Sequence, residues 1–84
     1  MTEIINESVS VNLLSNNLKA VAAPSSLYWR GRRYQITKVG LRYTTREGRT
    51  LFHIFSVTDG VTCFKLRFDT ETLLWRLLET ESGT

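Results

Sequence analysis

The 84-residue sequence contains few of the features that mark secreted, membrane or redox proteins. Its single cysteine, Cys63, excludes an internal disulfide and favours a reducing compartment. The first ten residues contain two acidic and no basic side chains, so we expect no secretory signal there. No apolar run approaches the length of a membrane span. We therefore expect a cytoplasmic protein with no membrane partner.

Motifs of catalysis and cofactor binding are also missing. There is no glycine-rich phosphate loop, no nucleophile elbow and no metal-ligand spacing. His53 is the only histidine and falls on the apolar face of an expected strand, where a buried, hydrogen-bonded histidine is the commoner arrangement. Cys63 has no histidine on its own face and is expected to be a packed or half-exposed thiol. We therefore expect no enzymatic activity, no cofactor and no metal.

Positive charge is concentrated in the central part of the chain. The formal net charge is +3, and residues 27–76 hold ten of the eleven Lys and Arg residues but four of the eight Asp and Glu residues. Most of these cations are arginines, which bind phosphates and carboxylates with two hydrogen bonds. The sequence thus permits a polyanionic partner, and the same charges also suit the solvated faces of a small domain.

Composition and length predict one small globular domain. Hydrophobic residues make up 42% of the chain and charged residues 23%, as in folded proteins. We expect a domain at 8–80 between frayed termini at 1–7 and 81–84. Alternation in residues 9–13 predicts a first strand, and residues 18–26 are expected to form a connection.

The chain after this connection predicts sharply bent strands. A short strand at 27–30 and a longer one at 33–44 are separated by Gly31, which allows a tight turn. In the longer strand the alternation of apolar residues shifts phase near Thr37, which predicts a β-bulge. A bulge followed by Gly40 is a pattern by which small barrels close.

Asp59-Gly60 predicts a two-residue type I′ hairpin loop. This register places Thr58 opposite Val61 and His53 opposite Leu66. One face of the hairpin is then expected to form the core: Leu51, His53, Phe55, Val57, Thr62, Phe64, Leu66 and Phe68. The other face contains Phe52, Ile54, Ser56, Cys63, Lys65 and Arg67.

The C-terminal segment allows two interpretations. A helix at 70–80 would align its leucines in one stripe. Alternatively, a hairpin loop leads into a last strand in which Leu73, Trp75 and Leu77 face inward. We favour the strand, because it continues the meander and places Trp75 beside Leu66. The expected fold is all-β: a small, strongly bent antiparallel meander of five to six strands that forms an SH3-like barrel or half-barrel.

The stretch at 28–34 combines aromatic rings with three arginines. On a nucleic acid, such rings stack on bases while arginines bind phosphates. In a purely structural interpretation, Trp29 lies in the core and the arginines lie at the rim. Cations on the outward face of the hairpin around Asp59-Gly60 and on the last strand would extend this nucleic-acid-binding surface. The expected nucleic-acid-binding residues are Arg30, Arg32, Arg33, Lys65, Arg67 and Arg76.

Phe52 and Ile54 are the large apolar residues on the outward face of the hairpin. In the favoured register Lys65 also lies opposite Arg76, and like charges in that position destabilise a sheet. We therefore expect this face to be covered, by the strand at 9–13, by a second copy of the chain or by a nucleic acid, in that order. Phe52 and Ile54 are accordingly the expected protein-interaction residues.

Several positions form a wider pattern: Pro24, Trp-Arg-Gly-Arg-Arg-Tyr at 29–34, Phe68-Asp69 and Trp75-Arg76-Leu77. This pattern resembles a small bacterial family known as a domain of unknown function, over residues 8–78. The family usually has a tryptophan where this chain has Tyr43. Some members look appended to proteins related to error-prone DNA polymerases, which implies a role in DNA repair. The resemblance implies no catalytic or binding residues.

Two functions from different classes follow. The favoured hypothesis is a non-catalytic protein-interaction module or homodimer that uses Phe52, Ile54 and an exposed strand edge, because small barrels commonly bind proteins or peptides. The alternative is a module associated with DNA repair that binds single-stranded DNA or RNA through its arginines.

Overall fold

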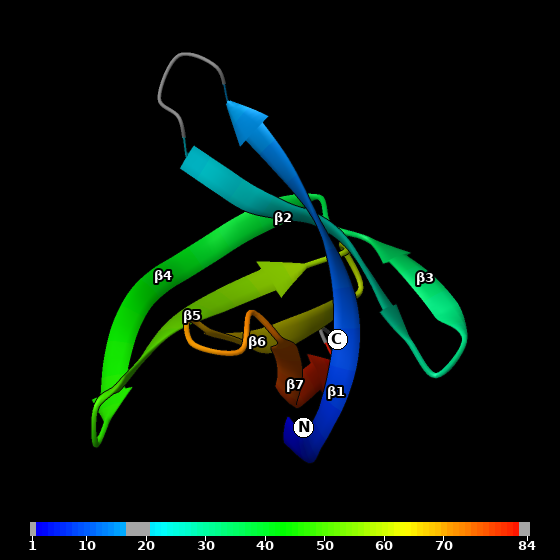
Figure 1. Cartoon of the computed structure of the whole chain (residues 1–84). Coiled ribbons are helices and arrows are strands. Elements are labelled where there is room, and N and C mark those ends of the chain that lie inside the picture. The colour runs from blue at the N-terminus through cyan, green and yellow to red at the C-terminus, as the bar shows by residue number, and fades with distance from the viewer. Residues whose placement is uncertain (1, 17–20, 83–84) are drawn as a thin grey trace.

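The computed structural model describes residues 2–16 and 21–82, and within these ranges every regular element is a β-strand. The seven strands are β1 (Thr2–Asn16), β2 (Val21–Trp29), β3 (Arg32–Gln35), β4 (Lys38–Glu47), β5 (Thr50–Thr58), β6 (Thr62–Asp69) and β7 (Trp75–Ser82). They form one antiparallel sheet in the order β3-β2-β1-β7-β6-β5-β4 (Figure 1). The predicted all-β meander is confirmed, with seven strands instead of five to six. No helix of the described residues is long and apolar enough to cross a membrane.

The sheet bends back on itself because its two edge strands, β3 and β4, are consecutive in the chain. Only Ile36 and Thr37 separate them. The N–H of Ile36 donates to the carbonyl of Ser25 on β2 (2.9 Å), and the N–H of Thr37 donates to the carbonyl of Thr58 on β5 (2.8 Å). Two successive amides thus bond to opposite halves of the sheet, which makes it a half-barrel. Beyond this link β4 diverges from β3 (Figure 1).

The predicted bulge lies between Val39 and Arg42, slightly later than the phase shift near Thr37 indicated. Gly40 lies inside it, and a Cβ at this position would approach the carbonyl oxygen of Ser56 to 3.4 Å. β4 therefore passes close to β5 at Gly40, at the short limit of ordinary van der Waals contact for an added Cβ.

The inner face of the half-barrel contains the hydrophobic core. Strands from both halves contribute to it, with Leu27, Ile36, Phe55, Val57, Phe64, Leu66, Trp75 and Leu77 buried together. Val9 and Val11 of β1 pack against this cluster. β1 therefore completes the core and does not cover Phe52 and Ile54, which was the arrangement expected first.

The β5–β6 hairpin has the predicted faces in a different register. Thr58 pairs with Cys63 and not with Val61, so the loop is wider than the predicted two-residue turn. The Asp59 carboxylate stabilises this loop, because its Oδ1 accepts hydrogen bonds from the N–H groups of Val61 (2.9 Å) and Thr62 (2.7 Å). The pairing moves by two residues, which keeps each side chain on its predicted face.

The C-terminal strand is confirmed, and the alternative of a C-terminal helix is wrong. Trp75 lies opposite Phe68, with 4.9 Å between ring centroids, and not beside Leu66 as predicted. His53 also lies opposite Phe68 instead of Leu66, from the β5 side. Trp75 is buried as expected, whereas Leu73 is exposed in the preceding loop.

The described parts of the expected frayed termini, residues 2–7 of 1–7 and residues 81–82 of 81–84, belong to the sheet. β1 begins at Thr2, and β7 continues to Ser82. β2 also occupies most of the expected connection at 18–26. The first and last of these segments are mostly polar, so hydrophobic alternation could not reveal them; pairing between β1 and β7 holds them in place. The first residue and the last two lie outside the described ranges.

Candidate binding edge on β3 and β4

Arg30, which was expected to bind phosphate, is paired within the chain. Its Nη2 lies 2.7 Å from Oε2 of Glu7 on β1, and the indole N–H of Trp29 donates to Oε1 of the same carboxylate (2.9 Å). The Arg30 guanidinium also lies 4.6 Å from the centroid of the Trp29 ring. The hydrogen bond between Arg30 and Glu7 is the main cause that raises the pKa of Arg30 and lowers that of Glu7. The ion pair between Arg30 and Glu7 therefore links the β2–β3 turn to β1.

Replacing Glu7 with glutamine is expected to reduce the acid sensitivity of the fold. Hydrogen bonds from Arg30 and Trp29 hold the pKa of Glu7 below its ordinary value of 4.5. A carboxyl with a lowered folded-state pKa stabilises the fold above its unfolded pKa, and this contribution is lost as pH falls through the folded pKa. Circular dichroism melts between neutral and strongly acidic pH should therefore show a shallower loss of stability below about pH 4.5 in Glu7→Gln.

Glu71→Gln is the matched control for this experiment, because it removes an exposed carboxylate from the β6–β7 loop. It should retain the acid sensitivity of the unmodified protein. If Glu7→Gln and Glu71→Gln have the same pH profile, the ion pair between Glu7 and Arg30 does not stabilise the fold.

The three cations predicted on the outward face of β6 and β7 also have partners within the chain. The contacts are Lys65 with Glu79 (4.0 Å), Arg67 with Glu47 (3.7 Å) and Arg76 with the Asn6 carbonyl (2.9 Å). The like-charge neighbours across the ladder are Arg67 and Arg76, not Lys65 and Arg76 as predicted. β1 separates these strands from β2 and β3 in the sheet. The six predicted nucleic-acid-binding residues therefore lie on both sides of β1 in the strand order.

Phe52 and Ile54, the predicted protein-interaction residues, are buried instead of exposed, with 7% and 3% of their surface accessible. The guanidinium of Arg67 lies 4.5 Å from the centroid of the Phe52 ring. Ile54 lies between Tyr43 on β4 and Arg67 on β6 in the strand pairing. Long side chains from the neighbouring strands thus cover both residues, and a second chain is not needed to do so.

A different set of cations lacks a carboxylate within 4.0 Å among the described residues and lies on one continuous stretch of chain. This set, the basic rim, consists of Arg32, Arg33, Lys38, Arg42, Arg46 and Arg49. It runs from β3 through β4 to the turn before β5. Glu47 is the only acidic residue in this stretch, and it is paired with Arg67. The basic rim therefore places positive charge along both edges of the sheet.

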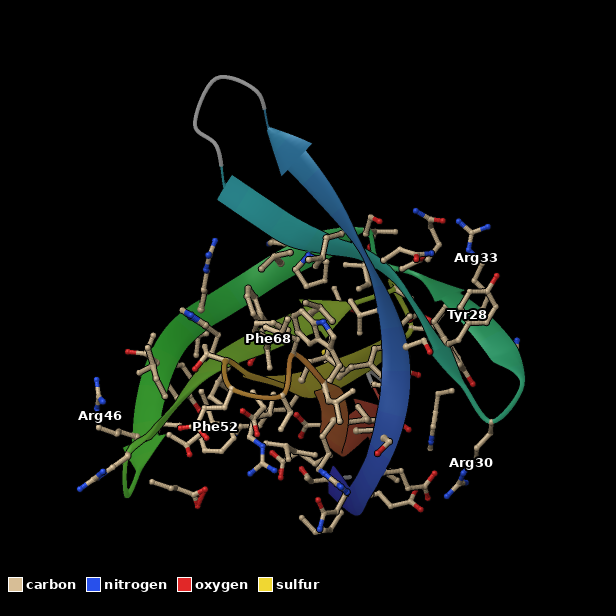
Figure 2. The ribbon with its side chains drawn as sticks, viewed as in Figure 1. Tyr28, Arg30, Arg33, Arg46, Phe52 and Phe68 are labelled. Carbon is tan, nitrogen blue, oxygen red and sulfur yellow. The ribbon has the colours of Figure 1, made fainter. Side chains whose placement is uncertain are left out.

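The inner side of β4 is basic, and the strand has a free edge. β4 pairs only with β5 among the described residues, and residues 40–47 are all exposed. Arg42 and Arg46 lie opposite Phe55 and Leu51, which places both arginines on the inner face. The Arg42 guanidinium lies 5.1 Å from the centroid of the Phe55 ring. Arg46 lies near the end of β4 that leads into β5 (Figure 2).

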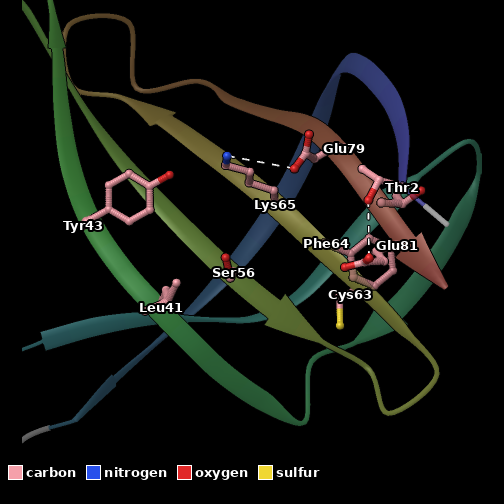
Figure 3. Close-up of a pocket in the computed structure, with 10 residues that line it drawn as sticks. Thr2, Leu41, Tyr43, Ser56, Cys63, Phe64, Lys65, Glu79 and Glu81 are labelled. Atoms are coloured by element: carbon pink, nitrogen blue, oxygen red, sulfur yellow. Dashed lines mark hydrogen bonds and ion pairs between the residues drawn. The ribbon is translucent and has the colours of Figure 1, made fainter. Parts of the chain in front are cut away.

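The outer side of β4 is apolar. Leu41 and Tyr43 expose 69% and 44% of their surface. They border a hollow over β5 and β6 that Ser56 and Lys65 also line (Figure 3). β4 therefore presents a basic side and an apolar side along one free edge.

The same hollow contains Cys63 and Glu79 at the β6–β7 end (Figure 3). The Cys63 thiol is exposed, and His53 lies on the other face of the sheet beside Phe68. Within the described residues, no group of three or more His, Cys, Asp or Glu side chains is placed to hold a metal ion. What this surface offers a ligand is charge, apolar area and the backbone groups of a strand edge.

Arg42 and Arg46 were not among the residues that the sequence was expected to use for binding. The signal available was the excess of Lys and Arg in residues 32–49. This excess of charge indicates a binding site only in combination with the strand order, which shows that β4 lies at an edge of the sheet. An interior strand with the same side chains would have no free backbone groups.

Comparisons with protein-family models, with curated proteins and with solved structures found no match. The resemblance to the bacterial family of unknown function therefore stays a prediction.

Proposed function

We propose that this protein is a non-catalytic protein-interaction module that binds an extended segment of a partner by adding it as a strand to the free edge of β4. The observation that carries this proposal is the ten-residue length of β4, with an unpartnered edge and with residues 40–47 all exposed. The single cysteine is in keeping with a cytoplasmic location.

An exposed edge strand carries a row of backbone N–H and C=O groups that lack partners in the sheet. An added strand satisfies these groups with main-chain hydrogen bonds, while its side chains contact the two sides of the edge strand. The β4 edge is long enough for such a ladder, because β4 has ten residues and an ordinary strand has about five or six.

A second copy of this chain is a poor occupant of the same edge. A continuous antiparallel sheet formed by two β4 strands would gather Arg42 and Arg46 of both copies on one side of the ladder, and in the register centred on Thr44 would place them directly opposite each other. Like charges directly opposite each other across a ladder are destabilising. The favoured occupant is therefore a different polypeptide, and the homodimer expected from the sequence is not part of this proposal.

Selection from a random twelve-residue peptide library on the immobilised protein tests the proposal. We expect enriched peptides to bind and to shift backbone amide resonances of residues 40–47 in ¹H–¹⁵N spectra. A peptide containing N-methylated residues should lose binding, because it cannot complete the ladder. Enriched peptides that shift only amides elsewhere, or no enrichment above an unrelated protein, would refute the proposed function.

A second function is favoured by one further observation. The exposed Tyr28 lies opposite Arg33 in the β2–β3 pairing, which places an aromatic ring beside a cation of the basic rim (Figure 2). Single-stranded DNA or RNA could use this combination for stacking and phosphate contacts, as the implied role in DNA repair would require. Titration with a single-stranded oligonucleotide at low and physiological salt distinguishes this function, because phosphate binding weakens steeply with salt.

A further inference from the structure

We infer that the segment bound at the β4 edge is an acidic strand of alternating pattern, with carboxylates on the inner side and small apolar residues on the outer side. This inference rests on the proposed function and specifies the chemistry of its ligand. It follows from the different character of the two sides of β4.

The inner side of β4 provides two cations at a fixed spacing. Arg42, Thr44 and Arg46 alternate with outer residues and lie opposite Phe55, His53 and Leu51 in the β4–β5 pairing. A strand rises by about 3.3 Å per residue, so Arg42 and Arg46 are separated by roughly 13 Å along the edge. An added strand presents its first, third and fifth side chains on this side at the same repeat. Carboxylates at the first and fifth positions would therefore meet the two arginines.

These arginines are available for a ligand. Neither has a carboxylate within 4.0 Å among the described residues. The nearest acidic residue in sequence is Glu47, which pairs with Thr50 on the outer side and forms an ion pair with Arg67. A carboxylate of a bound ligand could thus form an ion pair with Arg42 or Arg46 without displacing a carboxylate of the described residues.

The outer side of β4 favours apolar residues at the second and fourth positions of the ligand. On this side Leu41 exposes most of its surface, and Tyr43 exposes nearly half. Ile54, which pairs with Tyr43, continues the apolar surface inward. Small β-branched residues at the second and fourth positions of the ligand would lie opposite Tyr43 and Thr45, and the one opposite Tyr43 would also be a diagonal neighbour of Leu41. Such residues also favour an extended conformation. The pattern is therefore acidic, apolar, polar, apolar, acidic.

Two labelled peptides test this pattern by fluorescence polarisation. One contains Glu-Val-Thr-Val-Glu between Gly-Ser flanks, and the other contains Glu-Glu-Thr-Val-Val between the same flanks. Both have the same composition and charge, but the second places a carboxylate and a valine on each side in every register. We expect the alternating peptide to bind about tenfold more tightly, because cross-strand pairs favour it at each position.

Charge reversal in the protein provides the matching test. The double variant Arg42→Glu, Arg46→Glu should lose about tenfold or more in affinity for the alternating acidic peptide and should gain affinity for Lys-Val-Thr-Val-Lys. The control variant Arg32→Glu, Arg33→Glu makes the same change of charge on β3, the other edge of the sheet. It should keep the preference for the alternating acidic peptide. Thermal melts of both variants establish that each is folded.

Equal binding of the two acidic peptides, or equal losses in the two variants, would overturn the inference and indicate non-specific attraction between charges. Selected library peptides that map to residues 40–47 but carry no acidic residues would overturn the inference and leave the proposed function standing. A single-stranded oligonucleotide that displaces the alternating peptide and binds more tightly at physiological salt would overturn both in favour of nucleic-acid binding.

Discussion

Leu66→Ala is expected to lower the free energy of unfolding by about 3 kcal/mol, which would leave little net stability in a domain of this size. Leu66 has 0% of its surface exposed and lies between Phe55 on β5 and Leu77 on β7, both of which are buried. Truncation removes apolar contacts and leaves a cavity that the flanking strands cannot close, because they are fixed by ladder hydrogen bonds. Urea unfolding followed by tryptophan fluorescence measures the effect.

Leu74→Ala is the control for this prediction, because Leu74 is an exposed leucine in the β6–β7 loop. It should change the free energy of unfolding by less than about 0.5 kcal/mol. Similar losses in the two variants would mean that β6 does not run through the centre of the core.

Phe52→Ala is expected to lower the free energy of unfolding by about 3 kcal/mol and to leave the mass in solution unchanged. The Phe52 ring is buried under Arg67, so its removal exposes apolar surface of β5 and deprives the Arg67 guanidinium of its cation–π contact. Urea unfolding and sedimentation velocity measure the two quantities.

Leu41→Ala separates stability from binding on the same face of the sheet. Leu41 is exposed, so the variant should keep its free energy of unfolding within about 0.5 kcal/mol and should lose affinity for the alternating peptide. A Phe52→Ala variant that is fully stable but changes its mass in solution would restore Phe52 to the role of an interface residue.

Periodicity in the sequence was enough to predict which side chains of the central hairpin face inward. Phe55, Val57 and Phe64 are buried as the alternation indicated, because side chains two residues apart share one face whatever the exact pairing. The pairing itself was wrong by two residues. The pairing depends on the Asp59 carboxylate, which accepts hydrogen bonds from two backbone N–H groups. These hydrogen bonds favour a wider loop than the Asp-Gly pair alone indicates.

The candidate site was harder to predict, because it depends on contacts between residues far apart in sequence. Arg30 is paired with a carboxylate 23 residues away on β1, and no local pattern reveals this pairing. The burial of Phe52 and Ile54 depends on long side chains from β4 and β6. The charge of residues 32–49 was visible in the sequence, but the free edge of β4 followed only from the strand order.

The pairing of β1 with β7 has a consequence for the order in which the protein folds. Thr2 and Glu81 are in contact although they lie 79 positions apart in the sequence, and the apolar side chains of β1 complete the core. During synthesis β1 leaves the ribosome before β7, so it cannot pair with β7 until that strand has followed. The β1–β2–β3 and β4–β7 meanders can each form from local contacts before that moment, whereas closing so long a loop is slow. We therefore expect formation of the β1–β7 ladder to be the slow step of folding.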